Sequence, residues 1–172
     1  MNLQSDDFEL FGLPAQFELN RSDVDARWKH LQRQAHPDRF ADQGQAAQRL
    51  AMQWSVRINE AYQRLKDPLR RGAYLCQLRG VPVRANDNTS MPADFLIQQI
   101  QWREALDEAA DAAGLQQLAQ QTRHEHDQRL AQLAKCLDQT GDVAQAAEQV
   151  RALMFIERFA QEIDDRIDRI CA

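Results

Sequence analysis

One segment of this sequence places a proline directly before a carboxylate, at the end of an amphipathic helical pattern. The segment is His36-Pro37-Asp38, within residues 34–40. Proline fixes its own φ angle and pushes the preceding residue out of the helical region, so the chain is held in a turn here. Asp38 then becomes a carboxylate on a stiff turn, able to accept charge-assisted hydrogen bonds from an arginine of a partner protein. An ordinary helix stop and turn is the alternative.

Basic side chains accompany this segment. The helix before it carries Arg27, Lys29 and Arg33, and Arg39 follows Asp38 directly. A basic surface speeds the encounter with an acidic partner surface and makes the association sensitive to salt. Charges on a helix are also commonly no more than a solvated face, so both interpretations stay open for each single residue.

A second candidate site lies on the helix predicted at about residues 93–112. At 100° per residue, Phe95, Trp102 and Leu106 fall on one side, whereas a second apolar group falls on the opposite side and is continued by acidic residues. This second group consists of Leu96, Ile97 and Ile100, followed by Glu104 and Glu108. A helix in a three-helix bundle needs only one apolar stripe, so the second group indicates a partner site. Packing against the N-terminal half or the linker is the alternative.

Other chemistry-bearing residues do not form a recognisable site. His124 and His126 are two residues apart and point in different directions on a helix. Cys76, Cys136 and Cys171 are odd in number and have no Cys-x-x-Cys spacing, which indicates a reducing compartment rather than a disulfide framework. We expect no metal, cluster or other cofactor. Because no nucleophile–base arrangement or phosphate loop is present, we also expect no enzymatic activity.

Helical spacing dominates the whole chain and predicts an all-α fold. Seven helices are expected, at about residues 5–12, 22–35, 43–66, 69–79, 93–112, 115–139 and 142–171. Ser22 and Asp25 resemble a capping box at the start of the second helix. The third helix carries an apolar stripe that can pack against the second helix, formed by Leu50, Trp54, Ile58, Ala61, Tyr62 and Leu65. The last helix should bury Ile156, Ile163, Ile167 and Ile170, and Gly114 and Gly141 should separate the last three helices.

These elements predict two modules: a helical hairpin at 1–80, a linker at 81–92 rich in turn-forming residues, and an antiparallel three-helix bundle at 93–172. The net charge of −5 is divided unevenly, with +2 on residues 1–80 and −7 on residues 81–172. The acidic second half speaks against nucleic-acid binding. The chain has no apolar run long enough to span a membrane and no signal-like N-terminus, so a cytoplasmic protein is expected.

The first 75 residues resemble the J-domain of the DnaJ family. The resemblance rests on His36-Pro37-Asp38 at the tip of a hairpin, on the basic helix before it, and on the segment 62–68, Tyr-Gln-Arg-Leu-Lys-Asp-Pro, late in the third helix. Arg39 stands where many relatives have lysine, and the positive charge is retained. The resemblance implies docking on a DnaK-type chaperone and stimulation of its ATP hydrolysis.

The whole chain is similar to the HscB family, the J-type co-chaperones of iron–sulfur cluster biogenesis. The segment 95–108, Phe-Leu-Ile-Gln-Gln-Ile-Gln-Trp-Arg-Glu-Ala-Leu-Asp-Glu, carries this similarity, together with segments 10–14 and 151–155. The family binds its scaffold through positions that correspond to Leu96, Ile97, Ile100, Gln101, Glu104, Glu108 and Phe155. Ile97 replaces a methionine, and Gln101 replaces a glutamate and so lacks its charge. Phe155 is alternatively a plain core residue.

The similarity to HscB implies two partners, an IscU-type iron–sulfur scaffold and an HscA-type chaperone, for a protein that is a monomer or a weak dimer. Two rival functions remain. A general J-protein would bind many unfolded clients without preferring the scaffold, and a passive adaptor would not stimulate an ATPase at all.

Overall fold

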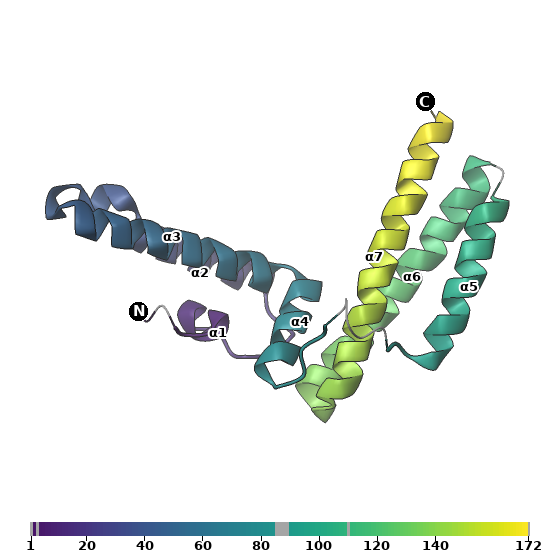
Figure 1. Cartoon of the computed structure of the whole chain (residues 1–172), viewed down its shortest axis with the longest axis horizontal. Helices are drawn as coiled ribbons and strands as arrows, with labels where there is room; N and C mark the ends of the chain where they lie inside the picture. Colours follow the sequence, from purple (N-terminus) through teal and green to yellow (C-terminus); the bar gives the residue numbers. More distant parts are fainter. Residues whose placement is uncertain (1, 3, 85–89, 110, 172) are drawn as a thin grey trace. The chain divides into compact units, whose positions relative to one another are not determined.

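The computed structural model describes all residues except 1, 3, 85–89, 110 and 172 (Figure 1). Within the described residues the chain forms α-helices together with one short 3-10 segment and one short π segment, and no strand, which confirms the all-α prediction. The chain divides into two compact units, residues 1–75 and 76–172. The predicted linker, 81–92, falls in the second unit, and its residues 85–89 lie outside the described part.

The first unit is built on a helical hairpin. Helix α2 (Arg21–Ala35) and helix α3 (Gln45–Lys66) pack side by side, and the 3-10 segment η1 (Pro37–Gln43) lies in the turn between them (Figure 1). The two helices bury small and branched apolar side chains against each other, among them Val24, Leu31 and Ile58. Burial of this shared stripe holds the hairpin together. Helix α4 (Pro68–Leu78) follows, with proline at its first position.

The short helix α1 (Asp7–Phe11) is fixed to α3 by a buried carboxylate. The Asp7 side chain is fully buried, and Arg64 donates two hydrogen bonds to it, at 2.5 and 3.0 Å. The Arg57 Nη1 atom lies 2.7 Å from Asp7 Oδ1 as an ion pair without hydrogen-bond alignment. The Asp7 carboxylate raises the pKa of Arg64 further, since the hydrogen bond favours the charged guanidinium. A buried charge needs such partners, so this cluster ties the N-terminus to the hairpin.

The second unit is a three-helix bundle of α5 (Ala93–Glu108), α6 (Ala112–Lys135) and α7 (Val143–Cys171), with a π turn η2 (Cys136–Thr140) at the end of α6 (Figure 1). Aromatic rings join α5 to α7: Trp102 stacks on Phe159 with centroids 5.5 Å apart, and Phe95 meets Phe155 edge to face at 5.7 Å. Such pairs add to the energy of apolar burial. The aromatic cluster therefore fixes which side of α5 faces the bundle and which side remains outside.

Two local predictions, the capping box at Ser22 and Asp25 and the helix break at Gly114, were wrong. Asn20, not Ser22, caps α2, because its side chain accepts a hydrogen bond from the Ser22 amide, while Asp25 pairs with Arg21 instead. Gly114 does not separate two helices: the Asp111 carboxylate caps α6 and binds the Gly114 amide inside the first turn.

Two residues of the predicted apolar stripes are exposed. Leu50 is 48% exposed, since it lies near the tip of the hairpin, where it lines a shallow groove with Phe40 and Trp54. Ile170 is also 48% exposed, because the end of α7 extends beyond α5 and α6 and no described helix covers it (Figure 1). Periodicity assigns a residue to a face, but it does not say how far the opposing helix reaches.

Candidate functional site

The hairpin tip presents the Asp38 carboxylate to solvent. His36 ends α2 with an extended backbone (ψ 127°), and Pro37 then begins η1. The Asp38 amide donates a hydrogen bond to His36 Nδ1 at 3.3 Å, which joins the first residues of the turn. The Asp38 carboxylate lies 3.5 Å from the same nitrogen, and its side chain is 89% exposed. Its charge is therefore available to a partner.

The 3-10 segment after Pro37 stiffens this tip, and the sequence did not reveal it. Arg39 donates a hydrogen bond from Nη1 to the carbonyl oxygen of Arg33 at 3.3 Å, which ties the turn to the end of α2. Arg39 thus supports the local geometry, in addition to any contact with a partner. The turn fixes the backbone from which the Asp38 side chain projects into solvent.

The structure separates the basic residues of α2. Lys29 and Arg33 are one helical turn apart, exposed, and on the same side of the helix as His30. Arg27 lies on another side, where its guanidinium approaches Gly12 at the end of α1. The surface that leads to the tip is therefore formed by Lys29 and Arg33 rather than by all three basic residues together.

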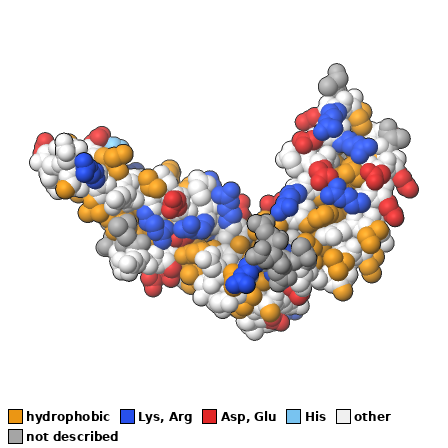
Figure 2. Space-filling view, in the orientation of Figure 1, with side chains coloured by type: hydrophobic (Ala, Val, Ile, Leu, Met, Phe, Trp, Pro, Cys, Tyr) orange, Lys and Arg blue, Asp and Glu red, His pale blue; other side chains and the backbone are white. Residues whose placement is uncertain are grey.

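The second apolar group of α5 is exposed in the structure. Leu96, Ile97 and Ile100 are 47%, 62% and 63% exposed, because Phe95, Trp102 and Leu106 take the buried side of the helix. Figure 2 shows hydrophobic side chains over the N-terminal part of α5 and acidic side chains over its C-terminal part. Gln101, Glu104 and Glu108 are exposed as well. We call the surface formed by Leu96, Ile97, Ile100, Gln101, Glu104 and Glu108 the α5 face.

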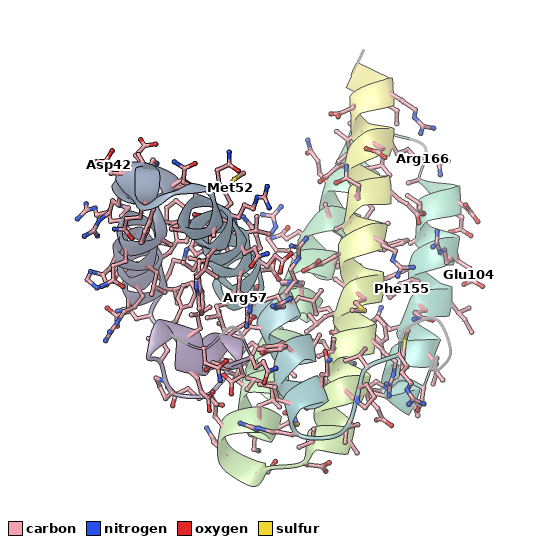
Figure 3. The ribbon with its side chains drawn as sticks, turned by 60° about the vertical axis from the view of Figure 1, so that its left-hand side comes forward. Asp42, Met52, Arg57, Glu104, Phe155 and Arg166 are labelled. Atoms are coloured by element: carbon pink, nitrogen blue, oxygen red, sulfur yellow. The ribbon has the colours of Figure 1, made fainter. Side chains whose placement is uncertain are left out.

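Phe155 lies on α7 beside this face and is half-buried. Its ring meets Phe95 and stacks on Phe159, with centroids 5.7 and 5.9 Å away. Figure 3 shows Phe155 on the side of α7 toward α5, and Glu104 on the outer side of α5. Phe155 therefore packs at the edge of the core and also reaches the surface. Its position is compatible with both interpretations from the sequence, a core residue and a binding residue.

Sequence reasoning missed Arg103 and Glu162, which join α5 to α7 next to Phe155. The Arg103 guanidinium bonds both carboxylate oxygens of Glu162, at 2.5 and 3.2 Å, and covers the rings of Phe155 and Phe159. Arg103 is the only basic residue of α5, and that was the available signal. The partner of Arg103 is 59 residues away in the chain, so no local pattern identifies it.

The described residues contain no group of three or more His, Cys, Asp or Glu side chains arranged to hold a metal ion. Cys76 and Cys136 are buried free thiols, and burial raises the pKa of Cys76 to about 11, so this thiol stays protonated near neutral pH. His126 contacts Glu157 and Asp127, and His124 bonds Gln128 instead. No helix among the residues described is long and apolar enough to cross a membrane.

Comparisons with known proteins identify the family of the chain. Residues 91–164 match a family model described as the HSCB C-terminal oligomerisation domain. The chain is 49% identical over 173 residues to a protein of Burkholderia thailandensis named co-chaperone protein HscB homolog, covering 99% of this chain and 98% of the relative.

Two solved structures share the fold. Chaperone HscB from Vibrio cholerae has 37% sequence identity and a TM-score of 0.80, and the alignment covers 96% of this chain and 99% of that one. Human co-chaperone protein HscB has 25% identity and a TM-score of 0.82, covering 98% and 83% of the two chains. Together with the full-length similarity to the bacterial relative, these matches show that the chain belongs to the HscB family of J-type co-chaperones of iron–sulfur cluster assembly.

Proposed function

We propose that this protein binds an IscU-type iron–sulfur scaffold on the α5 face and Phe155, delivers it to an HscA-type chaperone, and stimulates the ATPase of that chaperone through the hairpin tip. In this division of labour, residues 1–80 act on the chaperone, residues 93–172 hold the scaffold, and residues 81–92 connect them. The protein itself makes or breaks no bond. It binds one conformational state of the chaperone better than the other and so shifts the equilibrium toward ATP hydrolysis.

The observation that carries the proposal for the chaperone is the exposure of the Asp38 carboxylate on a turn held by Pro37 and η1. A backbone turn that is already ordered loses little conformational entropy on binding, and an arginine of the chaperone could engage both oxygens of the Asp38 carboxylate. His36 supports this geometry through its bond to the Asp38 amide. Lys29 and Arg33 would steer the encounter, and their contribution should weaken as salt rises.

The observation that supports scaffold binding is the exposed apolar group on α5 with acids beyond it. Three large apolar side chains within two helical turns are costly to leave in water, and covering them would drive association. Glu104 and Glu108 would contact basic groups of the scaffold at the rim. Gln101 cannot supply an ion pair there, so its contribution is limited to hydrogen bonding.

Steady-state ATPase measurements on the HscA-type chaperone, with and without the IscU-type scaffold, test this function. Wild-type protein should stimulate hydrolysis, the scaffold should increase the stimulation more than additively, and His36→Gln should abolish both effects. Stimulation that any unfolded client enhances equally would instead indicate a general J-protein. No stimulation at all would indicate a passive adaptor, and either result would refute the proposal.

A further inference from the structure

Arg103 occupies the boundary between the α5 face and Phe155. On the helix it follows Leu96 by seven residues and Ile100 by three, so it lies along the edge of the exposed apolar group. Its guanidinium carbon is 5.6 Å from the centre of the Phe155 ring and 5.2 Å from that of Phe159. The Arg103 guanidinium therefore lies on the surface between the α5 face and Phe155.

Glu162 fixes the orientation of Arg103. Both carboxylate oxygens accept hydrogen bonds from the two terminal nitrogens, an arrangement that sets the plane of the guanidinium as well as its position. Both side chains are about half exposed, at 48% and 46%, so an isolated bridge of this kind would add little to stability. Its contact with two aromatic rings distinguishes it from an ordinary surface ion pair.

Phe155 and Phe159 form a stacked pair with an interplanar angle of 12°. Phe159 is fully buried, whereas Phe155 remains partly accessible to solvent. A partly exposed ring at a helix edge keeps one orientation only if its neighbours restrict it. Phe95 restricts Phe155 from one direction by an edge-to-face contact, and Arg103 also restricts it by covering the ring.

We propose that Arg103, locked by Glu162, is a positioning residue of the scaffold-binding surface, which holds the Phe155 ring as the wall that α7 contributes to this surface. The inference rests on the proposed function, because it assigns the scaffold as the molecule that meets this wall. Arg103 acts on the scaffold through Phe155, and its loss should weaken scaffold binding without changing the action of the hairpin tip.

The test is a calorimetric titration of the full-length protein with the IscU-type scaffold. Arg103→Met keeps an unbranched apolar stem over the rings and removes the guanidinium, and it should weaken binding about fivefold. Arg103→Lys keeps the positive charge but cannot form the two-pronged bridge, so about a twofold loss is expected. Arg158→Met is the matched control, since Arg158 is exposed on α7 and forms no ion pair within the described part of the chain; its binding should equal wild type.

A double-mutant cycle separates positioning from a direct contact or a general structural role. If Arg103 acts through Phe155, then Arg103→Met should have no further effect in a Phe155→Leu background, yet keep its full effect in a Leu96→Ala background. Basal ATPase stimulation without scaffold and the far-UV circular dichroism spectrum should match wild type in every variant, which shows that the fold is intact.

The outcomes distinguish the two proposals. If the wild type binds and Arg103→Met binds equally well, or if its effect is undiminished in the Phe155→Leu background, the role of Arg103 is overturned and the proposed function stands. If the wild type does not bind the scaffold at all, both proposals are overturned. A loss that is fivefold in Arg103→Met, absent in Arg158→Met and absent when Phe155 is replaced supports the positioning role.

Discussion

The hairpin tip and the α5 face, the two proposed recognition sites, expose their side chains in opposite ways. The tip offers one carboxylate, Asp38, on a backbone turn that is set by the residues beside it in the chain, His36 and Pro37. The α5 face offers a group of apolar side chains spread over successive turns, and its wall, Phe155, comes from another helix. One region depends on local backbone geometry, and the other depends on the packing of a bundle.

This difference predicts how each region fails. A single charged hydrogen-bonding group contributes most of its energy in one contact, so one substitution should remove the activity of the tip. Apolar contacts are individually smaller and partly redundant, so the α5 face should lose affinity in steps.

The largest effect is expected from Asp7→Asn, which removes the charge between Arg57 and Arg64. Breaking one side of a buried ion pair costs about 3–5 kcal/mol, so the first unit should unfold at a clearly lower temperature. Chaperone stimulation should then be lost on warming, while scaffold affinity persists. Circular dichroism melting measures the unfolding temperature, and calorimetric titration measures the scaffold affinity. Asp23→Asn, at an exposed position of α2, is the control, and a parallel loss of scaffold affinity would break the contrast.

Asp38→Asn should abolish most of the ATPase stimulation, because the amide has nearly the same shape but cannot receive a charge-assisted pair of hydrogen bonds. Loss of one partner of such a pair costs about 2–5 kcal/mol in the complex. Stability should be unchanged, since the side chain is 89% exposed. Asp42→Asn, an exposed acid in the same 3-10 segment, should stimulate normally. Equal losses in both variants would mean that general charge, not the position of Asp38, matters.

Replacing Leu96 and Ile100 singly with Ser should each weaken scaffold binding by about fivefold to tenfold, which corresponds to roughly 1–1.4 kcal/mol for a partly buried apolar contact. The double variant should show about the product of the two losses if the sites are independent. Stimulation measured without scaffold should stay normal. Val56→Ser, an equally exposed apolar residue of α3, serves as the control for the scaffold titration. A complete loss from one single substitution would make the α5 face resemble the tip.

Removing the charges of Lys29 and Arg33 together should slow association with the chaperone several-fold at low salt, and the difference should shrink above about 0.3 M salt as screening grows. Stopped-flow association kinetics at increasing salt measure this effect. Arg27→Ala should change the rate less, because Arg27 lies beside Gly12 and away from the surface that leads to the tip. An equal effect of Arg27→Ala would restore the undivided basic face that the sequence suggested.

The smallest effect is expected from Gln101→Glu, which adds a negative charge to the α5 face. If the rim of the α5 face meets a basic surface, scaffold affinity should rise about twofold, in line with a rim ion pair. The measurement is a scaffold titration at low and high salt. Gln116→Glu, on an exposed position of α6, controls for the added net charge. A decrease in affinity would indicate that no basic group of the scaffold approaches residue 101.

Much of both regions could be predicted from the sequence. Proline acts on its own neighbours, so the turn at His36-Pro37-Asp38 followed from three adjacent residues. The two-sided pattern of α5 indicated that the bundle does not need to bury Leu96, Ile97 and Ile100, and the structure shows them exposed. The exposure of Leu50 and Ile170 was not predicted, because it depends on where a neighbouring helix ends and not on the period of the apolar pattern.

The helical pattern, the turn at Pro37 and the second apolar group of α5 can be inferred from the sequence alone, because each depends on residues within a few positions of one another. Three other features depend on tertiary packing: Arg103 meets Glu162 over Phe155, Asp7 is buried between two arginines, and Arg27 is separated from Lys29 and Arg33. These contacts join residues far apart in the chain or depend on which side of a helix faces its neighbours. Their partners are fixed by the packing of whole helices, and no local pattern contains that information.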